Sequence, residues 1–121
     1  MLPFAPPSTS RARALLDGFI KESHLGSRCR QEAVIVLGEL VSNALDHGSP
    51  MTGDCFEVAF ELHADGLVIT VCDGGANVAP HIVNAGPYAP RGRGLAMVQA
   101  LCRDWQVDRV SGTKVRAILN C

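Results

Sequence analysis

The chain has 121 residues, 47% of them hydrophobic and 19% charged, a composition that fits one globular domain over residues 1–121. Its formal net charge of −1 at pH 7 provides no basic surface for nucleic acid, and no apolar run approaches the length of a membrane span. Residues 1–10 lack the basic start and the apolar stretch of a signal peptide. We expect an irregular lead-in there.

Two helices are predicted next. Ser10 is a suitable N-cap for a helix over residues 11–20, in which several apolar side chains share one side. Ser27 can cap a longer helix over residues 28–47, which Gly48 then ends. This second helix is the longest periodic segment of the chain.

The middle of the sequence alternates with the period of a strand. In residues 55–63, apolar and acidic side chains point to opposite sides, as in a half-buried strand. Asp65 and Gly66 form a hairpin turn signal, and residues 67–73 return as the partner strand.

A segment rich in Gly, Pro, Asn and Arg follows, over residues 74–94, and loops of this length usually carry function. A helix over residues 95–103 and a hairpin of residues 105–110 and 113–119 complete the chain. This order of elements predicts an α+β fold. We expect a two-layer sandwich, with the helices on one face of a mixed, mostly antiparallel sheet.

The cysteines give no sign of cross-links or of a metal site. Their number is odd, no C-x-x-C occurs, and they lie far apart, at Cys29, Cys55, Cys72, Cys102 and Cys121. This spacing argues against both a disulfide framework and a zinc site. We therefore expect free thiols and a reducing cytoplasmic compartment.

One stripe of the long helix carries polar side chains. Glu39, Asn43 and His47 recur every four residues, opposite an apolar face that should dock on the sheet. A solvated surface explains most such stripes. However, Asn is unfavourable inside a helix because its amide competes for backbone hydrogen bonds. A carboxylate and an amide oxygen one turn apart are also ligands that Mg²⁺ accepts.

Asp73 ends the core-facing row of its strand, where an isolated carboxylate is costly unless it finds donors. It could accept the amides of Gly74, Gly75 and Ala76 in an Asx-type turn. Alternatively, it could accept the exocyclic amine of adenine, with Gly75 giving the ring close access. The turn is the better explanation on this stretch alone.

Gly92, Arg93 and Gly94 precede a predicted helix, whose free amides and positive dipole end would suit a phosphate. A glycine pair that merely hinges a loop is an equally good explanation. Because Met97 replaces the third glycine of G-x-G-x-x-G, and because no G-x-x-x-x-G-K-[ST] occurs, neither a Rossmann fold nor a P-loop is indicated.

Together these motifs resemble those of a known superfamily. The chain reads E-L-V-S-N-A-L-D-H-G on a helix, D-G-G after a strand, G-R-G-L-A-M-V at a helix start and S-G-T-K-V in the last hairpin. This is similar to the GHKL (Bergerat-fold) ATP-binding domains, and most of all to the anti-sigma-factor serine-protein kinases. The resemblance covers residues 11–119.

The resemblance implies a role for each matching position. Asn43 would ligate Mg²⁺ and Glu39 would be the general base. Asp73 would bind the adenine amine, supported by Thr113 and with Gly75 beside the ring. Phosphates would lie against Gly92, Gly94 and the Leu95 amide, and residues 76–93 would form the ATP lid. One departure is Asn77, which stands where the family commonly has a second glycine.

The implied function is that of an anti-sigma factor and ATP-dependent serine-protein kinase. Its cofactors would be ATP and magnesium, and its partners a sigma factor and an anti-sigma antagonist whose serine it phosphorylates. The resemblance also implies a possible homodimer, while charge and composition predict no contact with nucleic acid or membrane. The alternative is a non-catalytic, nucleotide-sensing binding module of the same fold.

Overall fold

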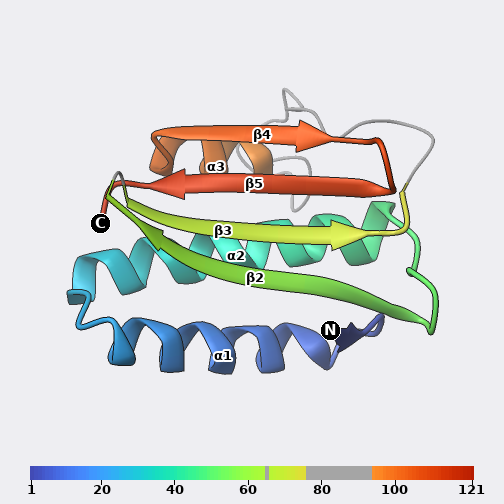
Figure 1. Ribbon diagram of the computed structural model, residues 1–121, viewed down its shortest axis with the longest axis horizontal. Coiled ribbons are helices and arrows are strands. Elements are labelled where there is room, and N and C mark those ends of the chain that lie inside the picture. The colour runs from blue at the N-terminus through green and yellow to red at the C-terminus, as the bar shows by residue number, and fades with distance from the viewer. Residues whose placement is uncertain (65, 76–93) are drawn as a thin grey trace, which may run out of the picture.

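The computed structural model describes residues 1–64, 66–75 and 94–121. Three helices and five strands lie in this part of the chain (Figure 1). The helices are α1 (Ser8–Glu22), α2 (Ser27–His47) and α3 (Gly94–Leu101). The strands are β1 (Leu2–Pro3), β2 (Cys55–His63), β3 (Gly66–Asp73), β4 (Asp104–Asp108) and β5 (Thr113–Leu119).

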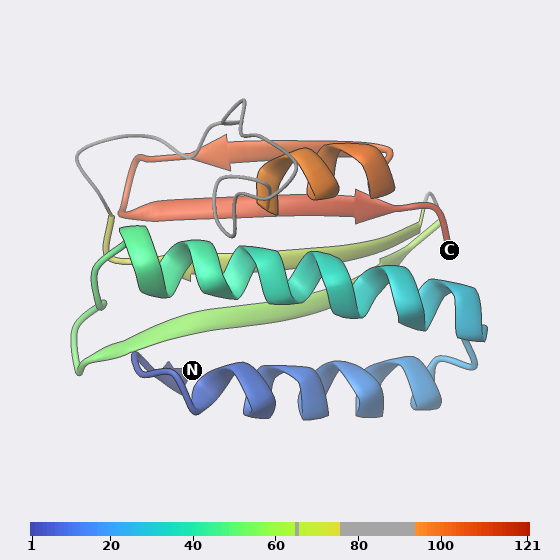
Figure 2. The ribbon, with the colours of Figure 1, turned by 180° about the vertical axis from the view of Figure 1, so that it is seen from behind.

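The strands form one open sheet in the order β1-β2-β3-β5-β4, and every neighbouring pair is antiparallel. Seen from behind, the helices cover a single face of this sheet (Figure 2). The α+β sandwich predicted from the sequence is therefore confirmed, with a sheet that is antiparallel throughout the described residues. Strands β3 and β5 are hydrogen-bonded neighbours although α3 and β4 separate them in sequence.

The core lies between the sheet and the helices. Strand β3 turns Leu67, Ile69 and Val71 toward the helices, and all three are buried. Helix α2 contributes its own buried row, namely Ala33, Val36, Leu37, Leu40, Val41 and Ala44. Each large aliphatic side chain fully removed from water contributes about 1.5–3 kcal/mol. Burial of this row holds α2 along the sheet.

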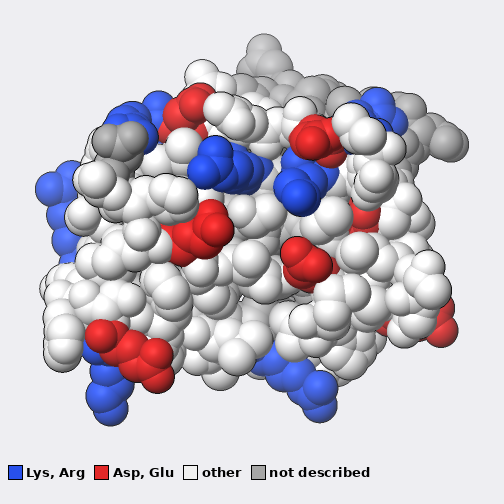
Figure 3. All heavy atoms as spheres, viewed as in Figure 1, with Lys and Arg blue, Asp and Glu red and all other residues white. Residues whose placement is uncertain are grey.

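The helix-free face of the sheet is polar. The cross-strand register places Glu57, Cys72, Lys114 and Asp108 in one row across β2, β3, β5 and β4. Figure 3 shows this face, with basic groups near its centre and acidic groups around them. An antiparallel sheet with one such charged face and one core face is stable in water.

The start of the chain is more regular than the expected lead-in. Leu2 and Pro3 pair with β2 as a short strand, and α1 begins at Ser8 rather than after a Ser10 cap. Pro7 occupies the N-cap position, and the Ser8 hydroxyl donates to the Pro3 carbonyl at 2.6 Å. Prolines are tolerated here because the first turn of a helix leaves its N–H groups unpaired.

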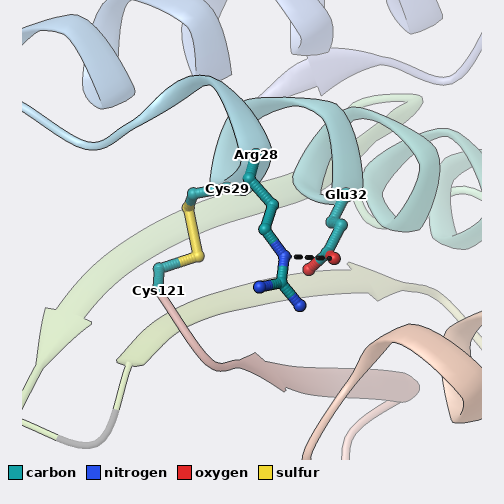
Figure 4. The surroundings of a disulfide bond; sticks show 4 residues. All are labelled: Arg28, Cys29, Glu32 and Cys121. Carbon is teal, nitrogen blue, oxygen red and sulfur yellow. Dashed lines mark hydrogen bonds and ion pairs between the residues drawn. A yellow bond between two sulfur atoms is a disulfide. The ribbon is translucent and has the colours of Figure 1, made fainter.

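The expectation of five free cysteines was wrong. Cys29, in the first turn of α2, forms a disulfide with Cys121, which follows β5 (Figure 4). The two residues are 92 positions apart in sequence, so only the fold reveals that they meet. The cysteine pattern therefore gives no support for a reducing compartment.

The three other cysteines are free. Burial raises the pKa of the Cys72 thiol, and it raises that of Cys102 to about 11. Both thiols are thus protonated and poorly nucleophilic at neutral pH. The remaining element boundaries differ from the predicted ones by a few residues at most, and residue 65 of the predicted hairpin turn lies outside the described residues. None of the helices described has the length and apolar character that a membrane crossing requires.

Candidate nucleotide-binding site

The C-terminal end of α2 meets the end of β3 and the beginning of β5 at one edge of the domain (Figure 1). Gly48 ends α2, and its N–H donates to the Ala44 carbonyl at 2.9 Å. A β-carbon at Gly48 would overlap the carboxylate of Asp73. Two polar segments that are distant in sequence are therefore in direct contact.

Asp73 is a buried carboxylate, with 5% of its surface exposed. The Gly75 N–H donates to its Oδ1 at 2.6 Å, and the Ser49 N–H donates to the same carboxylate. Burial raises the pKa of Asp73, and these two hydrogen bonds oppose the rise. The Asx-type turn onto Gly75 is therefore present, whereas the Gly74 N–H donates to the Ser49 carbonyl instead. Ala76 lies outside the described residues.

A turn of this kind does not exhaust the acceptor capacity of the carboxylate. An ionised Asp has two oxygens and about four lone-pair directions. The interpretation of Asp73 as a turn residue and the interpretation as an adenine ligand are consequently compatible.

Thr113 lies directly opposite Asp73 in the register of β3 and β5. Its side chain is buried, and its Oγ1 has no hydrogen-bond partner among the residues described. An unsatisfied buried hydroxyl costs about 1–3 kcal/mol. A ligand with a donor or acceptor at this point would remove that cost, which is the fit expected for the base of a nucleotide.

The backbone around this pair is closely packed and contains two glycines with positive φ. Gly75 has a φ of 108°, a conformation that strongly favours glycine, and Gly112 has a φ of 89°. A β-carbon at Gly112 would overlap the carbonyl oxygen of Asp73. The two glycines therefore let β3 and the β4–β5 turn come together without side chains between them.

Glu39 and Asn43 are half-buried, and His47 is exposed. Half-burial of the first two means that the buried side of α2 extends further round the helix than the predicted apolar face. The buried row of α2 extends over two flanks, so Glu39 and Asn43 lie along its border rather than on the solvent side. Helix α2 also packs against α3.

Helix α3 begins at Gly94, and Leu95 and Val98 anchor it in the core. Its N-terminus carries the partial positive charge of a helix start. The other expected phosphate-binding position, Gly92, and the expected lid over residues 76–93 lie outside the described residues, as does Asn77. Phosphate binding by Gly94 and the Leu95 amide stays a prediction.

The residues present fit a magnesium ion that accompanies a nucleotide. Within the part of the chain that the structure describes, no group of three or more His, Cys, Asp or Glu side chains forms a metal cage. Mg²⁺ is commonly held by one or two protein oxygens, with phosphates and water completing the shell. A single carboxamide such as that of Asn43 would suffice for that arrangement.

Sequence reasoning missed three contributors to this region, namely Gly48, Ser49 and Gly112. Gly48 and Gly112 belong to the motifs that carry the resemblance but were given no role in the site, and Ser49 was noted only as part of the helix stop. The available signal was Ser49-Pro50 directly after the helix stop, because both residue types favour a defined turn.

Comparison with known proteins agrees with this geometry. No curated protein matches the chain significantly. The sequence profile of the histidine kinase-like ATPase domain matches residues 2–119, which is nearly the whole chain. The match spans every element of the sandwich and all the polar segments described above. The chain therefore belongs to the histidine kinase-like ATPase domain family.

Proposed function

We propose that the protein binds Mg-ATP at the junction of α2, β3 and β5 and acts as an anti-sigma factor with serine-protein kinase activity. The observation that carries the nucleotide site is the buried Asp73–Thr113 pair. It offers a carboxylate acceptor beside a hydroxyl that has no partner in the described chain. An adenine edge has the amine and ring nitrogen that this combination would bind.

Each element would contribute one part of the site. Asp73 and Thr113 would hold the base, with Gly75 against the ring. Asn43 would bind the metal, while Gly94 and the Leu95 amide would hold phosphate. Because α2 extends from Asn43 to Gly48 and then contacts Asp73, one rigid element sets the separation between the metal and the base.

The bound nucleotide supplies the phosphoryl group and Mg²⁺ neutralises its charge, so the chain mainly has to orient the reactants. Glu39 lies one turn before Asn43 on the same border of α2. We propose that its carboxylate accepts the proton of the attacking serine hydroxyl. Glu39 is half-buried, so part of it remains accessible to a substrate.

The partners that we propose are a sigma factor and a small antagonist protein that carries the target serine. Both would act in the cytoplasm, and we propose that location. Cytosolic thiols are kept reduced as a rule. The Cys29–Cys121 bond would then form there only under oxidising conditions. We also propose a homodimer as the form that engages sigma.

The nucleotide site can be tested by titrating ATP and Mg²⁺ into the purified protein and measuring heat and thermal unfolding. Saturating ligand should raise the unfolding temperature, because it binds the folded state alone. Asp73→Asn should abolish this stabilisation. Asn43→Ala should remove its dependence on Mg²⁺. Equal stabilisation of all three proteins would contradict the assignment.

The kinase activity requires a separate experiment. With labelled ATP and an antagonist of the proposed type, the wild-type protein should produce phosphoserine. Glu39→Ala should bind ATP normally but transfer no phosphoryl group. If the wild-type protein binds ATP and transfers nothing, the alternative of a nucleotide-sensing module replaces the kinase.

A further inference from the structure

Ser49 contacts all three residues of the turn that ends β3. Its backbone N–H donates to the Asp73 carboxylate. Its carbonyl accepts the Gly74 N–H at 2.7 Å. Its hydroxyl donates to the Gly75 carbonyl at 2.8 Å. A single residue thus fixes the side chain and the main chain of the turn.

The turn needs such a restraint because of its composition. Gly74 and Gly75 have no β-carbon, and a glycine pair has more conformational freedom in the unbound chain than any other pair. Packing restrains Gly74, since a β-carbon there would overlap the Pro50 carbonyl oxygen. At Gly75 a β-carbon would meet Gly112 at 3.4 Å, so among the described residues packing is looser here than at Gly74.

The hydroxyl of Ser49 acts at this less restrained residue. Its hydrogen bond to the Gly75 carbonyl spans 26 positions of sequence and is partly buried. It fixes the direction of the peptide plane that follows Gly75. Two backbone hydrogen bonds from residue 49 hold Asp73 and Gly74 whatever its side chain. The Gly75 N–H is held by Asp73, whereas the Gly75 carbonyl is held by the Ser49 hydroxyl.

We propose that Ser49 is a positioning residue for the base of the nucleotide, and that its hydroxyl helps the site to select adenine over guanine. This inference rests on the proposed ATP site. Asp73 accepts a hydrogen bond from an amine, whereas guanine presents a carbonyl at the corresponding ring position, which the carboxylate repels. This discrimination requires a fixed distance between the base and the Asp73 carboxylate. If the Asp73–Gly75 turn could move away from the base, the site would accept either adenine or guanine.

Ser49 also links the two halves of the site. It follows Gly48 directly, so the helix that carries Asn43 continues without a spacer into the residue that holds Asp73. A site that is ordered before the ligand arrives loses less entropy on binding. The hydroxyl should consequently affect nucleotide affinity more than folding stability.

The test compares Ser49→Ala, Ser49→Cys and Ser49→Thr with the wild-type protein, using ATP and GTP titrations in Mg²⁺ together with thermal unfolding without nucleotide. Loss of one neutral hydrogen bond should weaken ATP binding about 5- to 10-fold. GTP binding should change by less than about 2-fold, so the ATP-to-GTP preference should fall. Ser27→Ala removes an exposed hydroxyl at the other end of α2 and is the matched control.

The three substitutions separate positioning from folding. Cys keeps the size of Ser but is a weak donor, so Ser49→Cys should weaken ATP binding even if Ser49→Ala is unstable. Ser49→Thr keeps the hydroxyl and should restore the nucleotide preference. An unchanged ATP-to-GTP preference in both Ala and Cys variants would overturn the inference while the ATP site stands. No ATP binding by the wild-type protein would overturn the proposed function itself.

Discussion

The two ends of α2 are anchored in different ways. At its N-terminal end, Cys29 is joined covalently to Cys121. At its C-terminal end, Gly48 and Ser49 are held against the Asp73 turn by close packing and hydrogen bonds. Figure 1 places these anchors at opposite ends of the domain. The disulfide end is complete without a ligand, whereas the glycine end retains polar groups that a ligand can use.

The largest effect should come from removing the covalent anchor. Cys121 is exposed, so Cys121→Ser deletes the cross-link and little else. A disulfide across 92 residues of sequence restricts the unfolded chain strongly, and its loss should lower the free energy of unfolding by about 4 kcal/mol. Urea denaturation of the oxidised protein and of the variant measures this difference.

The control for this experiment is Cys55→Ser, because Cys55 is a free thiol. A reductant should destabilise the wild-type protein and the Cys55 variant, but it should leave Cys121→Ser unchanged. ATP affinity should be the same in all folded forms, because the disulfide lies far from the site. A weakened ATP affinity in Cys121→Ser would show that the two ends of α2 are coupled.

The next largest effect should follow from a methyl group at the other end. In Gly48→Ala the new β-carbon overlaps the Asp73 carboxylate and the Ala44 carbonyl oxygen. Overpacking of this kind costs about 1–3 kcal/mol, and here it would also displace the carboxylate that we propose binds the base. We expect a lower unfolding temperature together with loss of ATP binding. The same substitution at Gly38, where a β-carbon meets no atom of the described residues within 4 Å, is the control.

A smaller effect should appear in the pH dependence of stability. Burial raises the pKa of Asp73 above its ordinary value of 3.8, so the folded protein keeps this proton to higher pH than the unfolded chain. Between the two pKa values the folded state binds more protons, and stability falls as pH rises. The stabilising contribution of Asp73 is full below its pKa in the unfolded chain and is lost above its pKa in the folded protein.

Asp73→Asn should remove this pH-dependent contribution to the free energy of unfolding. The difference in unfolding free energy, wild type minus variant, should therefore decline as pH rises from acid toward neutral. Urea denaturation at a series of pH values measures the difference. A rise instead of a decline would mean that the hydrogen bonds from Gly75 and Ser49 outweigh burial.

The smallest effect should come from the ion pair beside the disulfide. Arg28 and Glu32 lie one turn apart with Nε and Oε1 3.3 Å from each other, and the Arg28 side chain is 91% exposed (Figure 4). Exposed pairs at this spacing contribute about 0.3–0.5 kcal/mol. Glu32→Ala should change stability by no more than that, in low salt. If Glu32→Ala lowered the free energy of unfolding as much as Cys121→Ser, the ion pair and not the disulfide would be what anchors the N-terminal end of α2.

Much of the fold could be predicted from local patterns. Strand β2 begins and ends at the predicted residues, because its alternation is uninterrupted and loop residues flank it. Helix α2 differs from the predicted helix only in that it includes Ser27, because Gly26 and Gly48 mark its two ends. Both patterns act over a few residues, which is the range that sequence reasoning covers well.

The errors arose where distant residues decide the outcome. Strand β1 has two residues and exists only because β2 pairs with it. The Cys29–Cys121 bond depends on the path of the whole chain. Within the site, Asp73 and Thr113 were predicted, but their direct pairing follows from the sheet register. The hydrogen bonds of Ser49 to the Asp73–Gly75 turn follow from the packing of α2. No local pattern contains either kind of information.

The pairing of Asp73 with Thr113 also affects how this domain can diversify. Between them the described chain contains α3, which Leu95 and Val98 anchor in the core, and β4, which pairs with β5 at the edge of the sheet. Gly74 and Gly112 pack together where the chain leaves β3 and where it enters β5. Substitutions at these two glycines would therefore disturb the last pair of the β3–β5 ladder, whereas changes farther along the connection would leave that pair in place.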